Sequence, residues 1–75
     1  MALMTTQQAA DRIGKLTAKQ REVLRLMAQG LRNRRIGEAL GLTEKTIKMH
    51  RGALVKRLGV STAAEAMRLA IEAGL

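Results

Sequence analysis

The sequence predicts an all-α domain, a four-helix bundle that contains a helix-turn-helix. Four segments each end in a glycine followed by an aliphatic residue: Gly30-Leu31, Gly41-Leu42, Gly59-Val60 and Gly74-Leu75. A glycine at this place accepts the left-handed conformation that ends a helix. No segment shows the apolar–polar alternation of a half-buried strand. With 75 residues, the chain holds one domain.

The first fifteen residues are polar and weakly patterned, so we interpret residues 1–15 as a linker or a vector-derived start. Met4 follows closely on Met1, and Gly14 interrupts the helical turn that Ala9 to Ile13 favour. The domain proper is expected to span residues 16–75.

Helices are expected at about residues 18–29, 34–40, 44–58 and 63–73, because each of these segments follows a start signal. The signals are capping boxes at Thr17 with Gln20 and Thr62 with Glu65, and N-caps at Asn33 and Thr43. The expected core consists of Val23, Leu24, Met27, Ile36, Leu40, Ile47, Leu54, Leu58, Ala66 and Leu69.

The second and third expected helices are joined by Gly41-Leu42-Thr43. A short helix, a three-residue turn containing glycine and a longer helix form the layout of a helix-turn-helix. Other helical hairpins use similar turns, so the spacing alone favours this motif without establishing it.

The segment 44–58 has two distinct faces. At 100° per residue, Ile47, Leu54 and Leu58 lie within about 20° of one direction and form the core stripe. The opposite side carries Lys45, Lys48, Met49, Gly52 and Lys56, without an acidic residue. A bare glycine in mid-helix costs about 1 kcal/mol relative to alanine, which makes sense where another molecule comes close. An exposed methionine can contact a thymine methyl group, although either residue can also be ordinary surface.

Basic residues also gather at the start of the second expected helix, at Arg32, Arg34 and Arg35. A helix N-terminus offers backbone N–H groups and a positive dipole to a phosphate. We interpret this cluster as a phosphate clamp rather than a solvated charge run. Thr43, Lys45 and Thr46 can hold phosphate in the same way at the start of the third helix.

Charge and composition narrow the partner further. Lys and Arg total 14 against 6 Asp and Glu, a net charge of +8, and there is no Cys, Phe, Trp or Tyr. A basic chain without aromatic rings lacks stacking platforms for unpaired bases, so double-stranded nucleic acid is the favoured polyanion. His50 and Ser61 are the only His and Ser, so no catalytic triad assembles. We predict no enzyme, no cofactor, no metal site, no membrane partner and a cytoplasmic location.

Residues 16–75 resemble the LuxR-type (GerE- or FixJ-type) DNA-binding domain. The residues that carry the resemblance are Leu16-Thr17, Glu22-Val23-Leu24, Ala28 with Gly30, Asn33 with Ile36, Leu40-Gly41-Leu42, Thr46-Ile47-Lys48 with His50, Lys56-Arg57-Leu58-Gly59-Val60, Glu65-Ala66 and Gly74-Leu75. The resemblance implies a sequence-specific double-stranded DNA-binding domain of a bacterial transcriptional regulator, with the third helix in the major groove.

The resemblance also implies site residues. Base contacts are expected from Lys48, Met49 and Gly52. Backbone contacts are expected from Lys45, Thr46 and His50 and, more loosely, from Arg34. The charge and position of Arg35, Thr43 and Lys56, independently of the resemblance, add these three to the expected backbone contacts. A weak homodimer is expected through the fourth helix, at Met67, Ala70, Ile71 and Gly74. In this family the domain is normally the output half of a response regulator or a ligand sensor, so an upstream receiver or sensing domain is an expected partner, although stand-alone members exist.

The sequence departs from the family pattern at five positions. Ala18 and Gln20 stand where the family usually has Pro and Glu, and Arg35 and Gly37 stand in place of an acidic residue and Ala. Gly37 is expected to weaken a short helix. Gly52 lacks the side chain with which relatives contact a base. Sequence preference is therefore the property least safely transferred.

A rival hypothesis from another class is a basic helical protein-interaction module that docks an acidic partner. A net charge of +8 serves either function. The lack of acidic residues between positions 45 and 56 favours DNA.

Overall fold

The computed structural model describes residues 5–75, which form helices and no strand, as the sequence predicts. The helices are α1 (Thr6–Gly14), α2 (Ala18–Ala28), α3 (Asn33–Leu40), α4 (Glu44–Leu58) and α5 (Ala63–Glu72). None of the helices in this part of the chain is long and apolar enough to cross a membrane. The expectation of a vector-derived start at Met1 to Met4 falls outside the described residues.

α1 is a fifth helix, and it lies in the segment expected to be a linker. A capping box starts it, in which Thr5 Oγ1 accepts from the Gln8 amide at 3.1 Å and Gln8 Oε1 accepts from the Thr5 amide at 2.9 Å. Ala9 and Ile13 are buried, and α1 packs against α5. The polar composition of this segment obscured two apolar residues placed four positions apart, which is enough to attach a short helix.

The capping signals at the other helices are largely confirmed. Thr17 and Gln20 make both bonds of a capping box, at 3.1 and 3.0 Å. Thr62 Oγ1 accepts from the Glu65 amide at 3.2 Å, but the Glu65 carboxylate accepts from the Ser61 amide at 3.3 Å instead of closing the box. All four predicted glycine stops have a positive φ.

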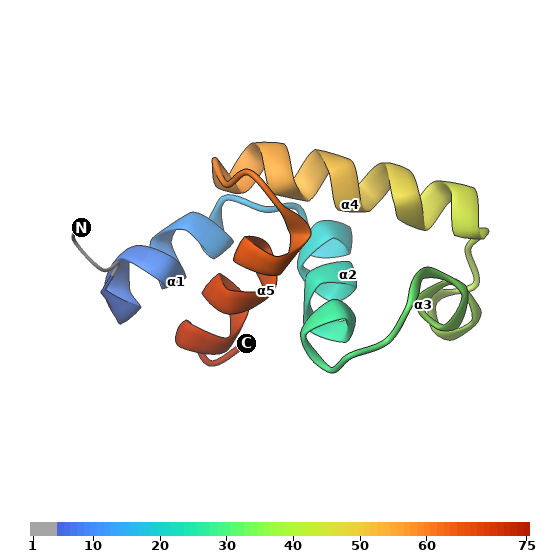
Figure 1. Cartoon of the computed structure of the whole chain (residues 1–75), viewed down its shortest axis with the longest axis horizontal. Coiled ribbons are helices and arrows are strands. Elements are labelled where there is room, and N and C mark those ends of the chain that lie inside the picture. Colours follow the sequence, from blue (N-terminus) through green and yellow to red (C-terminus); the bar gives the residue numbers. More distant parts are fainter. Residues whose placement is uncertain (1–4) are drawn as a thin grey trace.

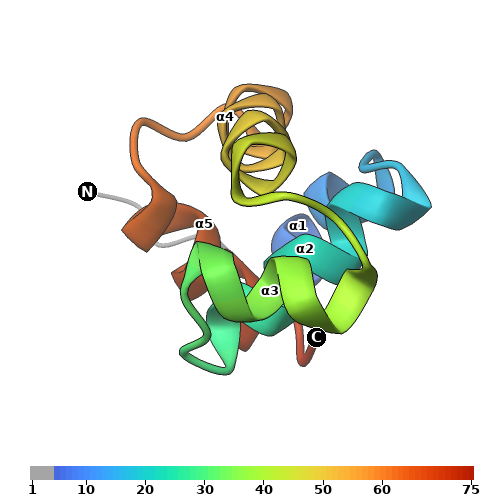
Figure 2. The same cartoon turned by 90° about the vertical axis from the view of Figure 1, so that its right-hand side faces the viewer.

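The helices are arranged around α4, which runs along the long axis of the molecule with α2 and α5 beneath it (Figure 1). α1 and α3 lie at opposite ends of that axis. Viewed from the α3 end, α4 is seen end-on above α3, which lies across the view (Figure 2). The two helices of the helix-turn-helix therefore cross steeply, and α4 forms one edge of the domain.

One core joins all five helices. The residues predicted to form it are buried except Leu40, which is half-buried at the end of α3. The structure adds Ala9, Ile13, Leu16, Leu26 and Ala70.

Gly37 has a structural role that its helix propensity does not indicate. A Cβ atom built at this position would collide with the Leu42 carbonyl oxygen. The Leu42 amide in turn donates to the Gly37 carbonyl at 2.9 Å. Gly37 therefore allows the turn to fold back closely onto α3.

We predict that Ile13→Ala destabilises the domain by about 2–5 kcal/mol, because it removes buried methyl groups and leaves a cavity. Ile71→Ala is the matched control, since Ile71 is 67% exposed whereas Ile13 is 5% exposed. Urea unfolding followed by circular dichroism measures both variants. Equal midpoints would show that α1 does not contribute to the stability of the domain.

We further predict that Gly37→Ala destabilises the domain by about 1–3 kcal/mol, because the added methyl group forces a backbone shift in the turn. Gly52→Ala is the control, because a Cβ at Gly52 meets no atom within 4 Å. That substitution should stabilise α4 by about 1 kcal/mol through helix propensity. Thermal unfolding should show a lower midpoint for Gly37→Ala and a higher midpoint for Gly52→Ala. A higher midpoint in both variants would contradict the close packing of the turn at Gly37.

Candidate nucleic-acid interface

The turn between α3 and α4 starts α4 in a defined way. Gly41 ends α3 with a φ of 68°, and Thr43 then caps α4 by accepting from the Thr46 amide at 3.1 Å. The Thr43 hydroxyl also donates to Thr46 Oγ1 at 3.0 Å. Because a hydroxyl carries one proton and two lone pairs, Thr46 keeps its own O–H free to donate outward. The start of α4 can therefore offer an anion the hydroxyl proton of Thr46.

α4 presents the two faces that the sequence predicts. Ile47, Leu54 and Leu58 are buried. Lys45, Lys48, Met49, Gly52 and Lys56 are exposed, with Met49 65% exposed. We call these five residues the α4 strip. The strip projects from an edge of the domain and joins three ammonium groups to one apolar side chain and one bare backbone position. This combination suits the floor of a groove that carries both phosphates and apolar groups.

A hollow of about 690 Å³ lies where the start of α3 meets the outward side of α4. It is lined by Arg32, Asn33, Arg34, Glu44, Lys48 and Arg51. Four of these side chains are cations and one is a carboxylate, so the hollow is an electropositive site next to the α4 strip. Lys48 belongs to both, which makes the hollow and the strip one continuous surface.

Asn33 connects α3 to α4 within this hollow. The Arg51 guanidinium donates to Asn33 Oδ1 at 2.7 Å in a half-buried setting, and hydrogen bonds from a charged donor are among the stronger ones in proteins. The expectation that Asn33 is an N-cap is wrong, because Arg32 occupies the N-cap position and no side chain caps α3. The sequence indicates no role for Arg51, since nothing in the local pattern pairs residues that lie eighteen positions apart.

The arginines of α3 point to different surfaces. Arg34 lines the hollow beside α4, and its Nε lies 3.5 Å from Glu38 Oε1 in an exposed ion pair. Such a surface pair is weak, so Arg34 can exchange its partner for a phosphate. Arg35 does not line this hollow but a second one, between α2 and α3. The structure therefore groups Arg34 with Lys48 and Arg51 and sets Arg35 apart.

The far end of α4 is held by α1. The Arg12 guanidinium donates to the Leu58 carbonyl oxygen at 3.2 Å, at the helix end where carbonyl groups lack helical partners and a cation is favourable. The sequence does not indicate this contact, because the polar segment before residue 16 favours a linker and Arg12 lies 46 positions from Leu58. His50, half-buried, and Lys56, exposed, lie along α4 between the two ends.

The residues expected to form a dimer surface on α5 are only partly accessible. Ile71 and Gly74 are exposed and Met67 is half-buried. Ala70 is completely buried, which corrects the expectation that it remains at the surface. The cause is that α5 packs against α1 as well as α2 and α4. The accessible large apolar side chains of this part of the chain are Ile71 and Leu75, with Met67 half-buried.

Comparisons with known proteins agree with this geometry. Residues 14–70 match the family model described as bacterial regulatory proteins, luxR family. The chain is 40% identical to the transcriptional regulatory protein MctR of Rhizobium johnstonii over 60 residues, which is 80% of this chain and 28% of that protein. It is 42% identical to the transcriptional regulatory protein UhpA of Salmonella typhimurium over 57 residues, 76% of this chain and 29% of that protein.

A third relative is the nitrate/nitrite response regulator protein NarL of Escherichia coli, 37% identical over 54 residues, 72% of this chain and 25% of that protein. The chain thus spans between a quarter and a third of the length of these relatives. The match covers the helix-turn-helix, the α4 strip and most of α5. The chain belongs to the LuxR family of bacterial regulatory proteins.

Proposed function

We propose that this chain is a sequence-specific, double-stranded DNA-binding domain of a transcriptional regulator, with α4 inserted in the major groove. The observation that carries the proposal is the α4 strip, presented at an edge of the domain by a helix-turn-helix. An α-helix fits the major groove, where each base pair displays a distinct pattern of donors, acceptors and methyl groups. The family match supports the same function.

The residues proposed to contact the bases are Lys48, Met49 and Gly52. A lysine can donate to guanine O6 and N7, and an apolar side chain can contact a thymine methyl group. Gly52 contributes no side chain but allows the DNA to approach α4 closely, since a Cβ there would meet open space. Discrimination therefore rests on two neighbouring residues, Lys48 and Met49.

A second set of residues is proposed to contact the DNA backbone. Phosphate contacts fix the register of a protein on the duplex and carry no direct sequence information. We assign to this set Arg34, Thr43, Lys45, Thr46, His50 and Lys56, together with Arg32 and Arg51, which line the hollow beside α4. Arg35, also expected from the sequence to contact the backbone, is left out because it lines the hollow between α2 and α3 instead. Asn33 acts through Arg51, because it fixes the guanidinium against α3.

The relatives are transcriptional regulatory proteins and a response regulator, and this chain spans less than a third of each. We infer that it supplies the DNA-binding output of a longer regulator whose upstream part is a receiver or sensing domain. A weak homodimer through Met67, Ile71 and Gly74 of the α5 end would place two copies on paired half-sites.

DNA binding is tested by titrating the domain into a natural promoter fragment at two salt concentrations. Affinity should fall as salt rises, because each neutralised phosphate releases counterions. An absence of binding at low salt would contradict the proposal and favour the rival interaction module. Selection from random duplexes then identifies the half-site.

Lys48→Ala should weaken binding to the selected site by about 1–3 kcal/mol and relax the preference at one base pair. Lys45→Ala should weaken all duplexes equally, because a phosphate contact is blind to sequence. Lys15→Ala, which makes the same charge change on an exposed residue at the C-terminal end of α1, is the control. Competition titrations with single-base variants of the site measure the affinity and base preference of the three protein variants. Equal and sequence-independent losses for Lys48→Ala and Lys45→Ala would remove Lys48 from the base-reading set.

Ile71→Glu should abolish cooperative binding to paired half-sites while binding to a single half-site survives. The apolar strip on α5 is small, so the free domain is expected to dimerise weakly, and DNA supplies the effective concentration. Ala10→Glu makes the same charge change at an exposed position of α1 and should keep cooperativity. Electrophoretic mobility shifts on one-site and two-site duplexes measure both variants. Intact cooperativity in Ile71→Glu would locate the dimer surface elsewhere.

A further inference from the structure

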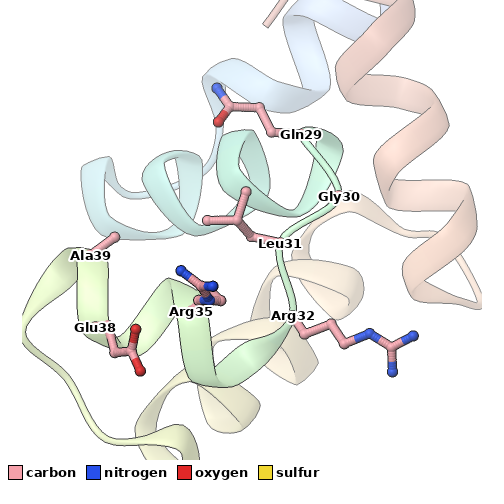
Figure 3. Close-up of a pocket in the computed structure, with 7 residues that line it drawn as sticks. All are labelled: Gln29, Gly30, Leu31, Arg32, Arg35, Glu38 and Ala39. Atoms are coloured by element: carbon pink, nitrogen blue, oxygen red, sulfur yellow. The ribbon is translucent and has the colours of Figure 1, made fainter.

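A second hollow lies on the flank of α3 that faces α2, away from the α4 strip. Its volume is about 720 Å³, and it is lined by residues 29–32 together with Arg35, Glu38 and Ala39 (Figure 3). Arg35 and Ala39 are four residues apart and therefore share one face of α3. Apart from the expectation from the sequence that Arg35 contacts the DNA backbone, no role given above uses this face.

The floor of the hollow is apolar. Gly30, Leu31 and Ala39 contribute no polar side-chain atom, and Figure 3 shows the Leu31 side chain directed into the space between α2 and α3. Leu31 is half-buried and packs against the core, so its position is fixed by the fold. Ala39 is exposed. An aliphatic side chain of a partner entering here would remove apolar surface from water on both molecules.

A single uncompensated cation stands over this floor. Among residues 5–75 the ion pairs are Lys19–Glu22, Arg34–Glu38 and Arg68–Glu72, so Arg35 has no carboxylate partner in this part of the chain. Glu38 is directed to Arg34 on the neighbouring row of α3. Arg32 also lines the hollow, but Figure 3 shows its guanidinium directed away from Leu31 and Arg35. Arg35 is left exposed beside the apolar floor.

We propose that this hollow, which we call the α2–α3 hollow, docks a short acidic segment of another protein. An aliphatic side chain of the segment packs on Leu31 and Ala39, and a carboxylate accepts from the Arg35 guanidinium, whose planar fork matches carboxylate geometry. A protein segment fits better than DNA, because phosphates and sugars offer no aliphatic side chain for an apolar floor. The site goes beyond DNA binding and would join a second protein to the domain while α4 is in the groove.

The experiment uses the ¹⁵N-labelled chain and a capped synthetic peptide of composition Glu-Asp-Leu-Leu-Asp-Glu as the probe. Titration followed by amide chemical shifts should perturb residues 29–39 and leave the α4 strip unchanged. A peptide of the same charge in which both leucines are replaced by serine should bind about tenfold more weakly, because the apolar contact is lost. Equal affinity for the two peptides, or shifts spread over all basic residues, would overturn the proposal in favour of non-specific charge attraction.

Two variants separate the parts of the site. Arg35→Glu should weaken peptide binding at least about tenfold, whereas Lys15→Glu, with the same charge change at the C-terminal end of α1 and outside the lining of the hollow, should have only a small effect. Ala39→Met fills the floor without changing charge, so it should weaken peptide binding and leave DNA affinity unchanged. Equal losses in Arg35→Glu and Lys15→Glu would overturn the assignment of Arg35.

A last titration tests whether the α2–α3 hollow binds a protein segment or DNA. The peptide titration is repeated on the complex with a duplex that the domain binds, and the same shifts at residues 29–39 are expected. Displacement of the peptide by the duplex, or perturbation of Arg35 and Ala39 by the duplex alone, would assign the hollow to the DNA interface and overturn the proposal. Because the duplex binding is measured separately, this result leaves the proposed DNA-binding function standing.

Discussion

The close contact between Gly37 and the Leu42 carbonyl lets the turn between α3 and α4 fold closely onto α3. A Cβ at position 37 would collide with that carbonyl oxygen, so a side chain there requires a shift of the turn. Ile36 of α3 and Ile47 of α4 are completely buried, and Arg51 of α4 donates to Asn33 of α3 at 2.7 Å. The turn at Gly37 connects the two helices that line the electropositive hollow beside the α4 strip, although Gly37 itself does not line it.

α4 is further fixed at both of its ends. Thr43 caps the first turn, and Arg12 of α1 donates to the Leu58 carbonyl at the last turn. A binding surface on a helix held in this way is preorganised, so little conformational entropy is lost when it engages a rigid groove. α1 thus has two structural roles, since it also packs against α5 and contributes Ala9 and Ile13 to the core. The same packing limits the accessible apolar surface of α5 to residues such as Ile71.

Local signals in the sequence predict most of the fold. Caps and glycine stops locate four helices, since they report backbone groups within one turn of the residue concerned. The core stripe of α4 follows from its periodicity.

The features that the sequence does not predict depend on contacts between distant segments. α1 was read as a linker although its Thr5–Gln8 capping box repeats the pattern of Thr17–Gln20, so the signal was present and the polar composition outweighed it. The Asn33–Arg51 bond and the burial of Ala70 had no local signal, because each needs the packing of two helices.

The arginines at the start of α3 show why a charge cluster in a sequence is not yet a site. The adjacency of Arg34 and Arg35 predicts a single phosphate clamp, yet consecutive residues on a helix point about 100° apart. Arg34 lines the hollow beside α4 with Lys48, whereas Arg35 joins Leu31 and Ala39 on the side of α2. The Arg34–Glu38 pair joins the two rows and gives Arg34 a carboxylate partner that Arg35 lacks among the described residues. A uniformly basic segment therefore supplies two surfaces of different chemistry, one suited to phosphates and the other to a carboxylate beside an aliphatic group.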